Sequence, residues 1–444
     1  MDTRPPVARG RAAVRPLPRT RTGSWLNLLQ AAITVAVAVG VAASAVLSSR
    51  ASGEWHDASR QEITWSAALV EDLRHVYGDE APFALHVAIA DSRARALRLA
   101  AGDAGSAGDL AAWESLAETQ TVGHLRQAAK GSGGLLDGDR YRLPEGGYDI
   151  ARRLADMRGA HPDLRDRDPA GAMADGDAAM RQAVTVALAT VPLVAVFVVL
   201  RGLILWSGAR AVRRGARARS AVPDVGLVPG PDPERRTAGP FGAVALLGWI
   251  LISVLPAGII VAGNQEQRAH SIATRGATKV STAITASSVV RTFQAEGERA
   301  LVLTELRGYA RELAAVDTAD ELQAAPRTVV ARADQQALPR LRPLVEAMTR
   351  LPEPASGVDP RTSRIAATGP TQWEALRKEQ NRAVDLAERA GQRGDTLQVA
   401  VLLASLGMTL SLLALAGSAP VLIRRGSGTL LALAVAATLG AYLL

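Results

Sequence analysis

Residues 90–101 read ADSRARALRLAA, and residues 304–315 read TELRGYARELAA. Aligned without gaps, the two stretches bring Arg93 onto Arg307 and Leu99 onto Leu313, 214 positions apart. The same offset places residues 28–48 on 242–262 and 183–200 on 397–414, which are all strongly apolar. It also places His56 on His270. The shared offset predicts a tandem duplication of one unit, in which both copies run in the same direction.

Apolar residues are concentrated in five blocks, which contain no formal charge in their cores. At a rise of about 1.5 Å per residue, about 20 apolar residues cross the hydrocarbon core of a bilayer. We therefore predict five membrane-spanning helices, at residues 25–48, 181–206, 241–263, 396–419 and 428–444. Buried helices of a large soluble protein are the alternative, but aromatic residues make up only 4% of the chain, which is little for such a core.

The distribution of charge predicts which segments lie inside the cell. Residues 1–24 contain six arginines and one aspartate, and residues 201–240 contain eight arginines and three acids. Short arginine-rich segments stay on the cytoplasmic side. We therefore expect a cytoplasmic tail (1–24), linker (207–240) and turn (420–427), with two long segments, 49–180 and 264–395, outside. The predicted localisation is a multi-pass protein of the cell membrane.

Both outside segments show apolar residues at the spacing of three to four that is typical of packed helices. In the first, the stripe includes Leu69, Leu73, Leu85 and Leu99, and in the second Val302, Leu306, Tyr309 and Leu313. No stretch alternates convincingly enough to predict a sheet. The expected fold class is an all-α membrane protein with two tandem extracytoplasmic helical bundles. Glycine- and proline-rich breaks, such as KGSGGLLDGD at 130–139, separate the helices.

Small residues recur at intervals of four in two of the predicted spans. This spacing lets two helices approach closely. The abundance of alanine explains the pattern equally well, so both interpretations stay open. The candidate helix-packing residues are Ala36, Gly40 and Ser44 in the first span and Ala432, Ala436 and Gly440 in the fifth.

The chain contains none of the common catalytic or nucleotide-binding motifs, and it has no cysteine. The acidic clusters at 137–140 and 163–169 are interleaved with arginine, so we expect solvated loops rather than calcium sites. We therefore predict a non-enzymatic protein without a cofactor or a metal.

The excess of basic residues lies beside the predicted spans and lacks accompanying aromatic residues, which argues against a nucleic-acid partner.

The stretch VRTFQAEGERALVLTELRGYARELAA (290–315) resembles the outside helical bundles of actinobacterial sensor histidine kinases of the nitrate/nitrite-sensing type. The resemblance rests on Phe293, Gln294 and Glu296, and the order of the next three residues, Gly297 to Arg299, departs from the family's element. The first segment lacks the element, and the chain has no kinase region. The resemblance implies a helical sensory-type bundle and does not identify a ligand.

Together these patterns favour a membrane protein whose outside bundles sense or bind a ligand or a partner. Its expected partners are the lipid bilayer and a protein at the cytoplasmic linker or in the membrane, and homo-oligomerisation is a further option. A structural scaffold of a membrane complex is the alternative, and a transport or export component is disfavoured by the charge-free spans. The candidate signal or ligand residues are His56, His270, Gln294, Glu296, Arg93 and Arg307.

Overall fold

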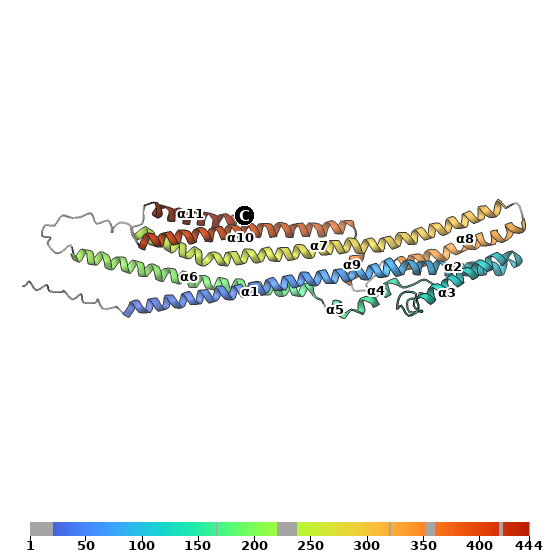
Figure 1. Ribbon diagram of the computed structural model, residues 1–444, viewed down its shortest axis with the longest axis horizontal. Coiled ribbons are helices and arrows are strands. Elements are labelled where there is room, and N and C mark those ends of the chain that lie inside the picture. The colour runs from blue at the N-terminus through green and yellow to red at the C-terminus, as the bar shows by residue number, and fades with distance from the viewer. Residues whose placement is uncertain are drawn as a thin grey trace, which may run out of the picture. The chain divides into compact units, whose positions relative to one another are not determined.

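A computed structural model describes residues 21–144, 146–165, 167–219, 238–318, 321–350, 360–416 and 421–443. Within these ranges every regular element is a helix, which confirms the predicted all-α class (Figure 1). Most of the predicted tail (residues 1–20), the centre of the linker (220–237) and residue 420 of the turn lie outside the described residues. The helices are α1 (Arg21–Leu73), the π-helix η1 (Arg74–Glu80), α2 (Ala81–Asp103), the 3-10 helix η2 (Gly105–Gly108), α3 (Asp109–Ala128), α4 (Ile150–Gly159), α5 (Pro162–Arg165), α6 (Pro169–Arg219), α7 (Ala238–Val316), α8 (Glu321–Thr349), α9 (Pro360–Ala366), α10 (Pro370–Ala416) and α11 (Val421–Leu443).

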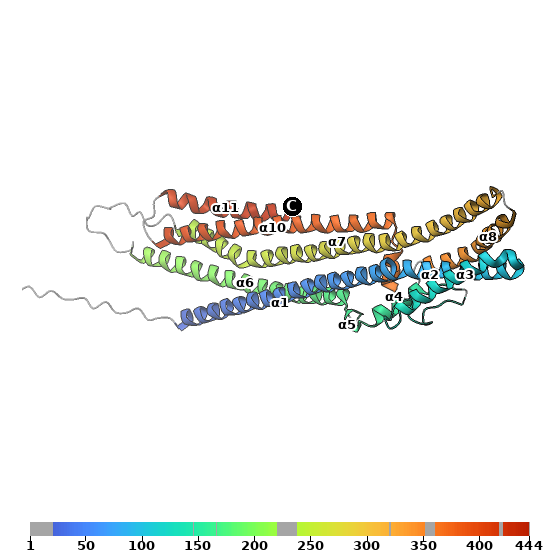
Figure 2. The same cartoon turned by 45° about the vertical axis from the view of Figure 1, so that its right-hand side comes forward.

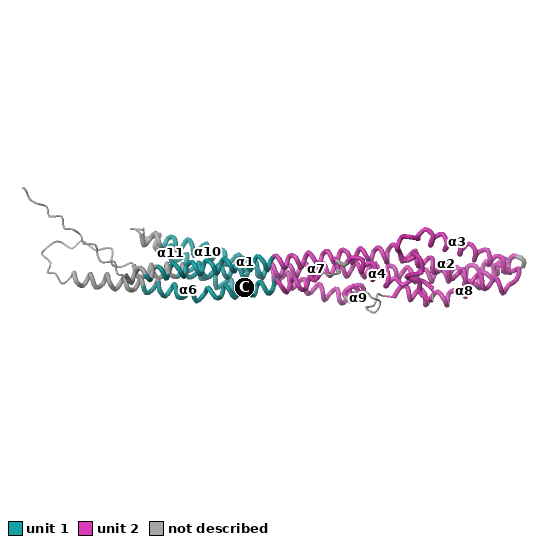
Figure 3. The backbone as a smooth tube through the Cα atoms, turned by 90° about the horizontal axis from the view of Figure 1, so that it is seen from below, with its two compact units in different colours: residues 1–52, 176–266, 388–444 teal, residues 53–175, 267–387 magenta. Residues whose placement is uncertain are grey.

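The chain divides into two compact units (Figure 3). Unit 1 contains residues 1–52, 176–266 and 388–444, and unit 2 contains residues 53–175 and 267–387. Unit 2 therefore combines almost all of both long segments that were predicted to lie outside. The sequence predicted one bundle for each segment and did not show whether the two bundles pack together, and the structure folds both segments into one unit.

Unit 1 contains the apolar ends of the long helices. Among the described residues, four helical runs are long and apolar enough to cross a membrane, which supports a membrane protein: Ala31–Asp103, Pro169–Leu200, Pro370–Ser411 and Gly426–Leu443. In a helix all interior backbone groups are hydrogen-bonded, as a lipid environment requires. The remaining predicted span, 241–263, lies within α7, and the side chains of residues 238–246 and 249 are outside the described set. The span at 241–263 stays a prediction.

The small residues of the first predicted span lie partly at a helix contact. The Ser44 hydroxyl is buried and donates to the carbonyl of Ala183 in α6 at 3.0 Å. A side chain at Gly40 would collide with the side chain of Thr190, which also belongs to α6. Ala36 is exposed instead. Gly40 and Ser44 therefore let α1 and α6 approach closely, while Ala36 does not take part in this contact.

The small residues of the fifth predicted span do not lie on the packed face of α11. Ala432 and Ala436 are exposed, and nothing lies within 4 Å of a side chain placed at Gly440. The buried face is formed by Leu431, Ala434 and Ala441, which pack against α7 and α10. The spacing of four recurs on several faces of an alanine-rich helix, so spacing alone does not identify the face that packs within the chain.

The core of unit 2 draws residues from both long segments. Trp65, Leu69, Leu73, Tyr77 and Leu85 of the first segment are buried in one cluster with residues of the second. These are Ala286, Val290, Phe293, Leu344, Val345 and Met348. The rings of Tyr77 and Phe293 meet edge to face, with centroids 5.9 Å apart. Neither segment contains this core alone, which explains why they form a single unit.

Beside this core, unit 2 contains two helix pairs, α2 with α3 and the C-terminal part of α7 with α8. The pair α2 and α3 is joined by a tight turn at Gly105, whose φ of 57° favours glycine. Figures 1 and 2 show α3 beside α2 and α8 beside α7. The α7–α8 contact is close at Gly297, where a side chain would collide with Val345 and Thr349 of α8. Helix α2 packs against both α3 and α8, so the two pairs form one four-helix arrangement.

Replacing Phe293 tests the shared core. Phe293→Ala removes a ring that is 1% exposed, and we expect a loss of about 3–5 kcal/mol in unfolding free energy. Phe83→Ala is the matched control, because the Phe83 ring is 62% exposed; its loss should stay within about 0.5 kcal/mol. Denaturant unfolding of the purified protein in detergent measures both. Equal losses for the two variants would contradict a core shared by both segments.

Candidate functional site

A partly buried group of charged residues in unit 2 lies between α2, α3, α7 and α8. We call it the arginine network, and it consists of Arg93, Glu114, Glu118, Arg311 and Asp334. Asp334 is fully buried and Arg93 is 5% exposed. Charged groups this far from water are retained when they are paired and hydrogen-bonded. The network therefore holds its four helices in one relative arrangement.

Each arginine of the network contacts the same two carboxylates. The Arg93 Nε donates to Asp334 at 2.7 Å, and its Nη2 donates to Glu114. The Arg311 Nη1 donates to Glu114 at 2.8 Å and to Asp334 at 3.0 Å. Because Arg93 and Glu114 belong to the first segment and Arg311 and Asp334 to the second, two of these ion pairs cross between the segments.

The backbone around the network brings its side chains together. The hydroxyl of Ser115 donates to the Ala94 carbonyl at 2.9 Å, which holds α3 against α2 beside Arg93. On the other pair of helices, Gly308 leaves room for α8, because the nearest atoms to a side chain there belong to Gln335 and Asp334. Close approach on both sides buries Arg93 and Asp334, whereas Glu114, Glu118 and Arg311 stay partly exposed.

The electrostatics of Glu114 follow from this environment. Burial alone would raise the pKa of its carboxyl, but the hydrogen bonds and charges of Arg311 and Arg93 outweigh burial, and the pKa lies below its ordinary value. The carboxylate is therefore charged throughout the physiological pH range and keeps both arginines paired.

Each of the three guanidinium nitrogens of Arg93 donates to a protein carboxylate. Its Nε contacts Asp334, its Nη1 contacts Glu118 and its Nη2 contacts Glu114. A free anion would have to break one of these ion pairs at a guanidinium that is only 5% exposed. The geometry supports a structural tie between segments rather than an anion-binding site.

A second charged cluster lies at Glu62 in α1. Its fully buried carboxylate accepts from Arg275 of α7 at 3.5 Å and from Arg361 of α9. The Arg361 guanidinium also lies 3.8 Å from the centre of the Trp65 ring, and Arg158 approaches that ring at 5.1 Å. Such cation–π contacts add to the ion pairs. This cluster again joins the first segment to the second.

Glu80, at the end of the π-helix, anchors the loop that follows α3. Its carboxylate accepts from Arg153 of α4 at 2.8 Å and from the backbone N–H of Leu135 at 3.0 Å. The Nε2 of His75 lies 3.0 Å from the same group. A π-helix shifts the register of its side chains relative to an α-helix, and here it places Tyr77 in the core and Glu80 toward the loop.

Most of the candidate residues predicted from sequence lie outside these clusters. His56, His270, Glu296 and Arg307 are exposed. Gln294 is half-buried and donates to the Thr349 carbonyl of α8 at 3.0 Å, a contact between helices. Arg93 alone among them belongs to the arginine network. The alignment paired Arg93 with Arg307, but the network contains Arg311, one helical turn farther along α7.

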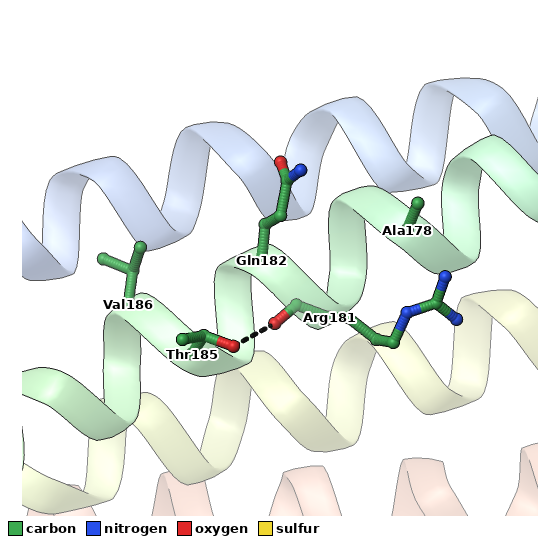
Figure 4. A pocket seen from close by; sticks show the side chains of 5 residues that line it. All are labelled: Ala178, Arg181, Gln182, Thr185 and Val186. Carbon is green, nitrogen blue, oxygen red and sulfur yellow. Dashed lines mark hydrogen bonds between the residues drawn. The ribbon is translucent and has the colours of Figure 1, made fainter.

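The surface depressions found on the structure are shallow. One is lined by five residues of α6, Ala178, Arg181, Gln182, Thr185 and Val186 (Figure 4). All five belong to one helix, so this is a feature of its surface. Another is lined by Arg95, Arg142 and the loop at Leu143–Pro144, where both guanidiniums lie near Asp91, at 2.6 Å and 3.4 Å. Among the described residues no group of three or more His, Asp or Glu is arranged to hold a metal.

Helix α7 exposes a large apolar face near its C-terminal end. The sequence predicted that its stripe of Val302, Leu306, Tyr309 and Leu313 packs within a bundle, but all four are more than half exposed. Leu303 and Val316 extend the same face. The residues that face α3 and α8 are smaller or polar, such as Gly308, Arg311 and Ala315. The prediction was therefore wrong about which face of this helix is packed inside the chain.

Helix α3 exposes a second apolar face. Trp113 is 70% exposed, and Leu110 and Leu116 lie nearby on the same helix at intervals of three. Large exposed apolar surfaces are uncommon on monomeric proteins and often mark interaction sites. These two faces are the surfaces of unit 2 best suited to contact another macromolecule.

Known proteins do not extend this picture. Comparisons with protein-family models, with curated proteins and with solved structures find no match.

Replacing Arg93 tests the network. In Arg93→Met the buried Asp334 keeps Arg311 as a partner but loses Arg93. We therefore expect a loss near the lower end of about 3–5 kcal/mol in unfolding free energy. Arg307→Met is the matched control, because Arg307 is exposed, and its effect should stay within about 0.5 kcal/mol. Urea unfolding of the two variants in detergent measures the difference. A larger effect of Arg307→Met would show that the sequence alignment, not the structure, identifies the paired arginines.

The lowered pKa of Glu114 predicts acid sensitivity. Its contribution to stability is complete above the ordinary glutamate pKa of about 4.3 and is lost as the pH falls through the lower folded-state pKa. Unfolding free energies measured from pH 7 to pH 3 should fall more steeply at the acid end for the native chain than for Glu114→Gln. Parallel curves for the two proteins would contradict the assignment.

Proposed function

We propose that this chain is a non-enzymatic, multi-pass protein of the cell membrane whose unit 2 lies outside and binds a protein partner. The observation that carries the proposal is the pair of exposed apolar faces on α7 and α3. Unit 2 offers apolar area for a macromolecule, whereas each guanidinium nitrogen of Arg93 already donates to a carboxylate of unit 2. A protein partner therefore agrees with the geometry better than a small anionic ligand.

The proposed topology rests on charge. The arginine-rich segments 1–24 and 201–240 are expected inside, and the two long segments, whose charges are mixed, outside. The proposal includes five spans, with 241–263 as the one beyond the four apolar helical runs. Arginines next to the spans would also attract anionic lipid headgroups.

Several contacts between α1 and α7 support the proposed duplication. Ser48 and Asn264 exchange hydrogen bonds at 2.8 Å and 2.6 Å across 216 positions. The Ser271 hydroxyl donates to the Trp55 carbonyl at 2.8 Å across 216 positions and lies 2.7 Å from the Ser59 hydroxyl across 212. These separations bracket the repeat offset of 214, as expected when equivalent helices of two copies run parallel and in register.

A sensory role follows from the resemblance of residues 290–315 to the bundles of sensor histidine kinases. In the proposal, unit 2 changes its partner contacts, and a separate cytoplasmic protein receives the signal. A structural scaffold is the second candidate function. It is favoured by the ion pairs that tie the two segments together at Arg93–Asp334 and Arg311–Glu114, because such ties suit a rigid support.

Photo-crosslinking tests the proposed function in the native membrane. A photoreactive phenylalanine at Tyr309 or Trp113 should give discrete protein adducts, because these side chains lie on the exposed apolar faces. The same residue at Arg307 or Thr121, which are exposed but lie outside the apolar rows, should give few. Adducts of equal yield at all four positions, or none at any, would contradict a specific partner surface.

The same experiment can separate the two candidate functions. A sensory module is expected to change its adduct pattern when growth conditions change, whereas a scaffold keeps the same adducts.

The side of the membrane on which unit 2 lies is measured independently on this cysteine-free chain. A cysteine at Thr121 should react with an impermeant maleimide in intact cells, and one at Ser220 in the linker should react after permeabilisation.

A further inference from the structure

We infer that the exposed face of α7 is a helix-pairing seam for a second copy of this chain, with the two α7 helices parallel. We call this face the α7 seam and define it by Val302, Leu306, Tyr309, Leu313 and Val316. The inference rests on the proposed function and names the partner. It follows from the spacing of these residues, their exposed area and the charges beside them.

The spacing within the α7 seam is that of a coiled coil. Its residues follow one another at intervals of four, three, four and three, so they alternate between the d and a positions of a heptad. This period of 3.5 residues keeps a row of side chains facing a single neighbouring helix. A helix that rests in the groove of its own bundle has no need for such a row on its outer face.

The area of the seam is large enough for a specific contact. The exposed fractions rise from 53% at Val302 and Tyr309 to 70% at Leu313 and 82% at Val316. With Leu303 beside them, these side chains expose on the order of 500 Å², at the upper end of what monomeric proteins show. Two copies would bury on the order of 1,000 Å² in total, which reaches the lower limit for specific interfaces.

The charges beside the seam favour parallel pairing. Glu298, Glu305 and Glu312 occupy the g positions. In an antiparallel pair, g positions face g positions, so the two rows of glutamates would repel each other. In a parallel pair each g position faces the e position of the other helix, which here is Leu303, Ala310 or Asp317.

Parallel pairing leaves one kind of like-charge contact, in which Glu312 of each copy faces Asp317 of the other at the end of the seam. The Glu312 carboxylate accepts from the Gln335 Nε2 of its own α8 at 2.6 Å, which holds it toward its own bundle. The orientation that the charges favour is also the one imposed by a shared membrane, because two copies inserted in the same direction present α7 in the same direction.

Cysteine cross-linking of the full-length chain tests the seam. The chain has no cysteine of its own, so a single introduced cysteine forms a disulfide only between copies. Leu306→Cys, Tyr309→Cys and Leu313→Cys should each give a species of twice the 46.4 kDa chain in oxidised native membranes. Cα atoms facing each other across a seam lie within the range that a disulfide requires. Arg307→Cys and Ala314→Cys are the controls, because both are exposed at b positions beside the seam.

Cross-linking at all three seam positions and not at the controls would support parallel pairing in register. Cross-linking at one seam position alone would indicate an antiparallel contact, which contradicts parallel pairing. Cross-linking at none of the positions, or at seam and control positions alike, would overturn the inference.

The double variant Leu306→Glu, Leu313→Glu should reduce the mass of the detergent-purified protein to that of one chain without lowering its melting temperature. Unchanged mass would also overturn the inference.

The outcomes separate this inference from the proposed function. If photoreactive residues at Tyr309 and Trp113 give adducts with a different protein while the seam cysteines give no disulfide, the partner-binding function stands and the second copy is excluded. If the impermeant maleimide fails to reach Thr121→Cys in intact cells, the proposed topology fails whatever the cross-links show.

Discussion

Two arginines and two carboxylates form four ion pairs in unit 2, and two of these pairs connect the two long segments of the chain. Arg93 and Arg311 each contact both Glu114 and Asp334, so every member of this group depends on residues from the other segment. The buried carboxylate of Glu62 forms the same kind of connection with Arg275 and Arg361. Because an unpaired charge in such a site is costly, the segments have one favourable arrangement. The rest of unit 2, including which face of α7 is exposed, follows from that arrangement.

Much of the architecture could be predicted from the sequence because it depends on local patterns. Apolar blocks and intervals of three to four predicted the helices, and four of the five expected spans lie in apolar helical runs of sufficient length. The joining of the two segments could not be predicted, since periodicity shows that a helix has an apolar face but not which helix covers it. For α7, the periodicity therefore predicted the wrong packed face.

Of the arginine network, only Arg93 was predicted from the sequence, because Glu114, Arg311 and Asp334 meet it through tertiary structure. A weak signal did exist, since Asp334 lies between the apolar positions Val330, Ala333 and Ala337.

The division between buried charge and exposed apolar surface bears on function. In this region the structure places charges where the two segments meet and leaves large apolar side chains, such as Leu313 and Trp113, on the outside. That is the reverse of the arrangement expected for an isolated soluble domain. It is explained if the ion pairs fix the helices in place and the apolar faces of α7 and α3 are covered by other proteins. The proposed membrane setting would raise the local concentration of such partners and limit their orientation.

Hydrogen exchange of the intact protein in detergent tests most directly whether the two segments form one cooperative unit. The account predicts that the slowest amides of α2, in the first segment, and of α8, in the second, exchange with the same free energy of opening, and that adding denaturant lowers both in parallel. Amides of α8 that remain protected while those of α2 open, or the reverse, would show that the segments unfold separately and would contradict the account.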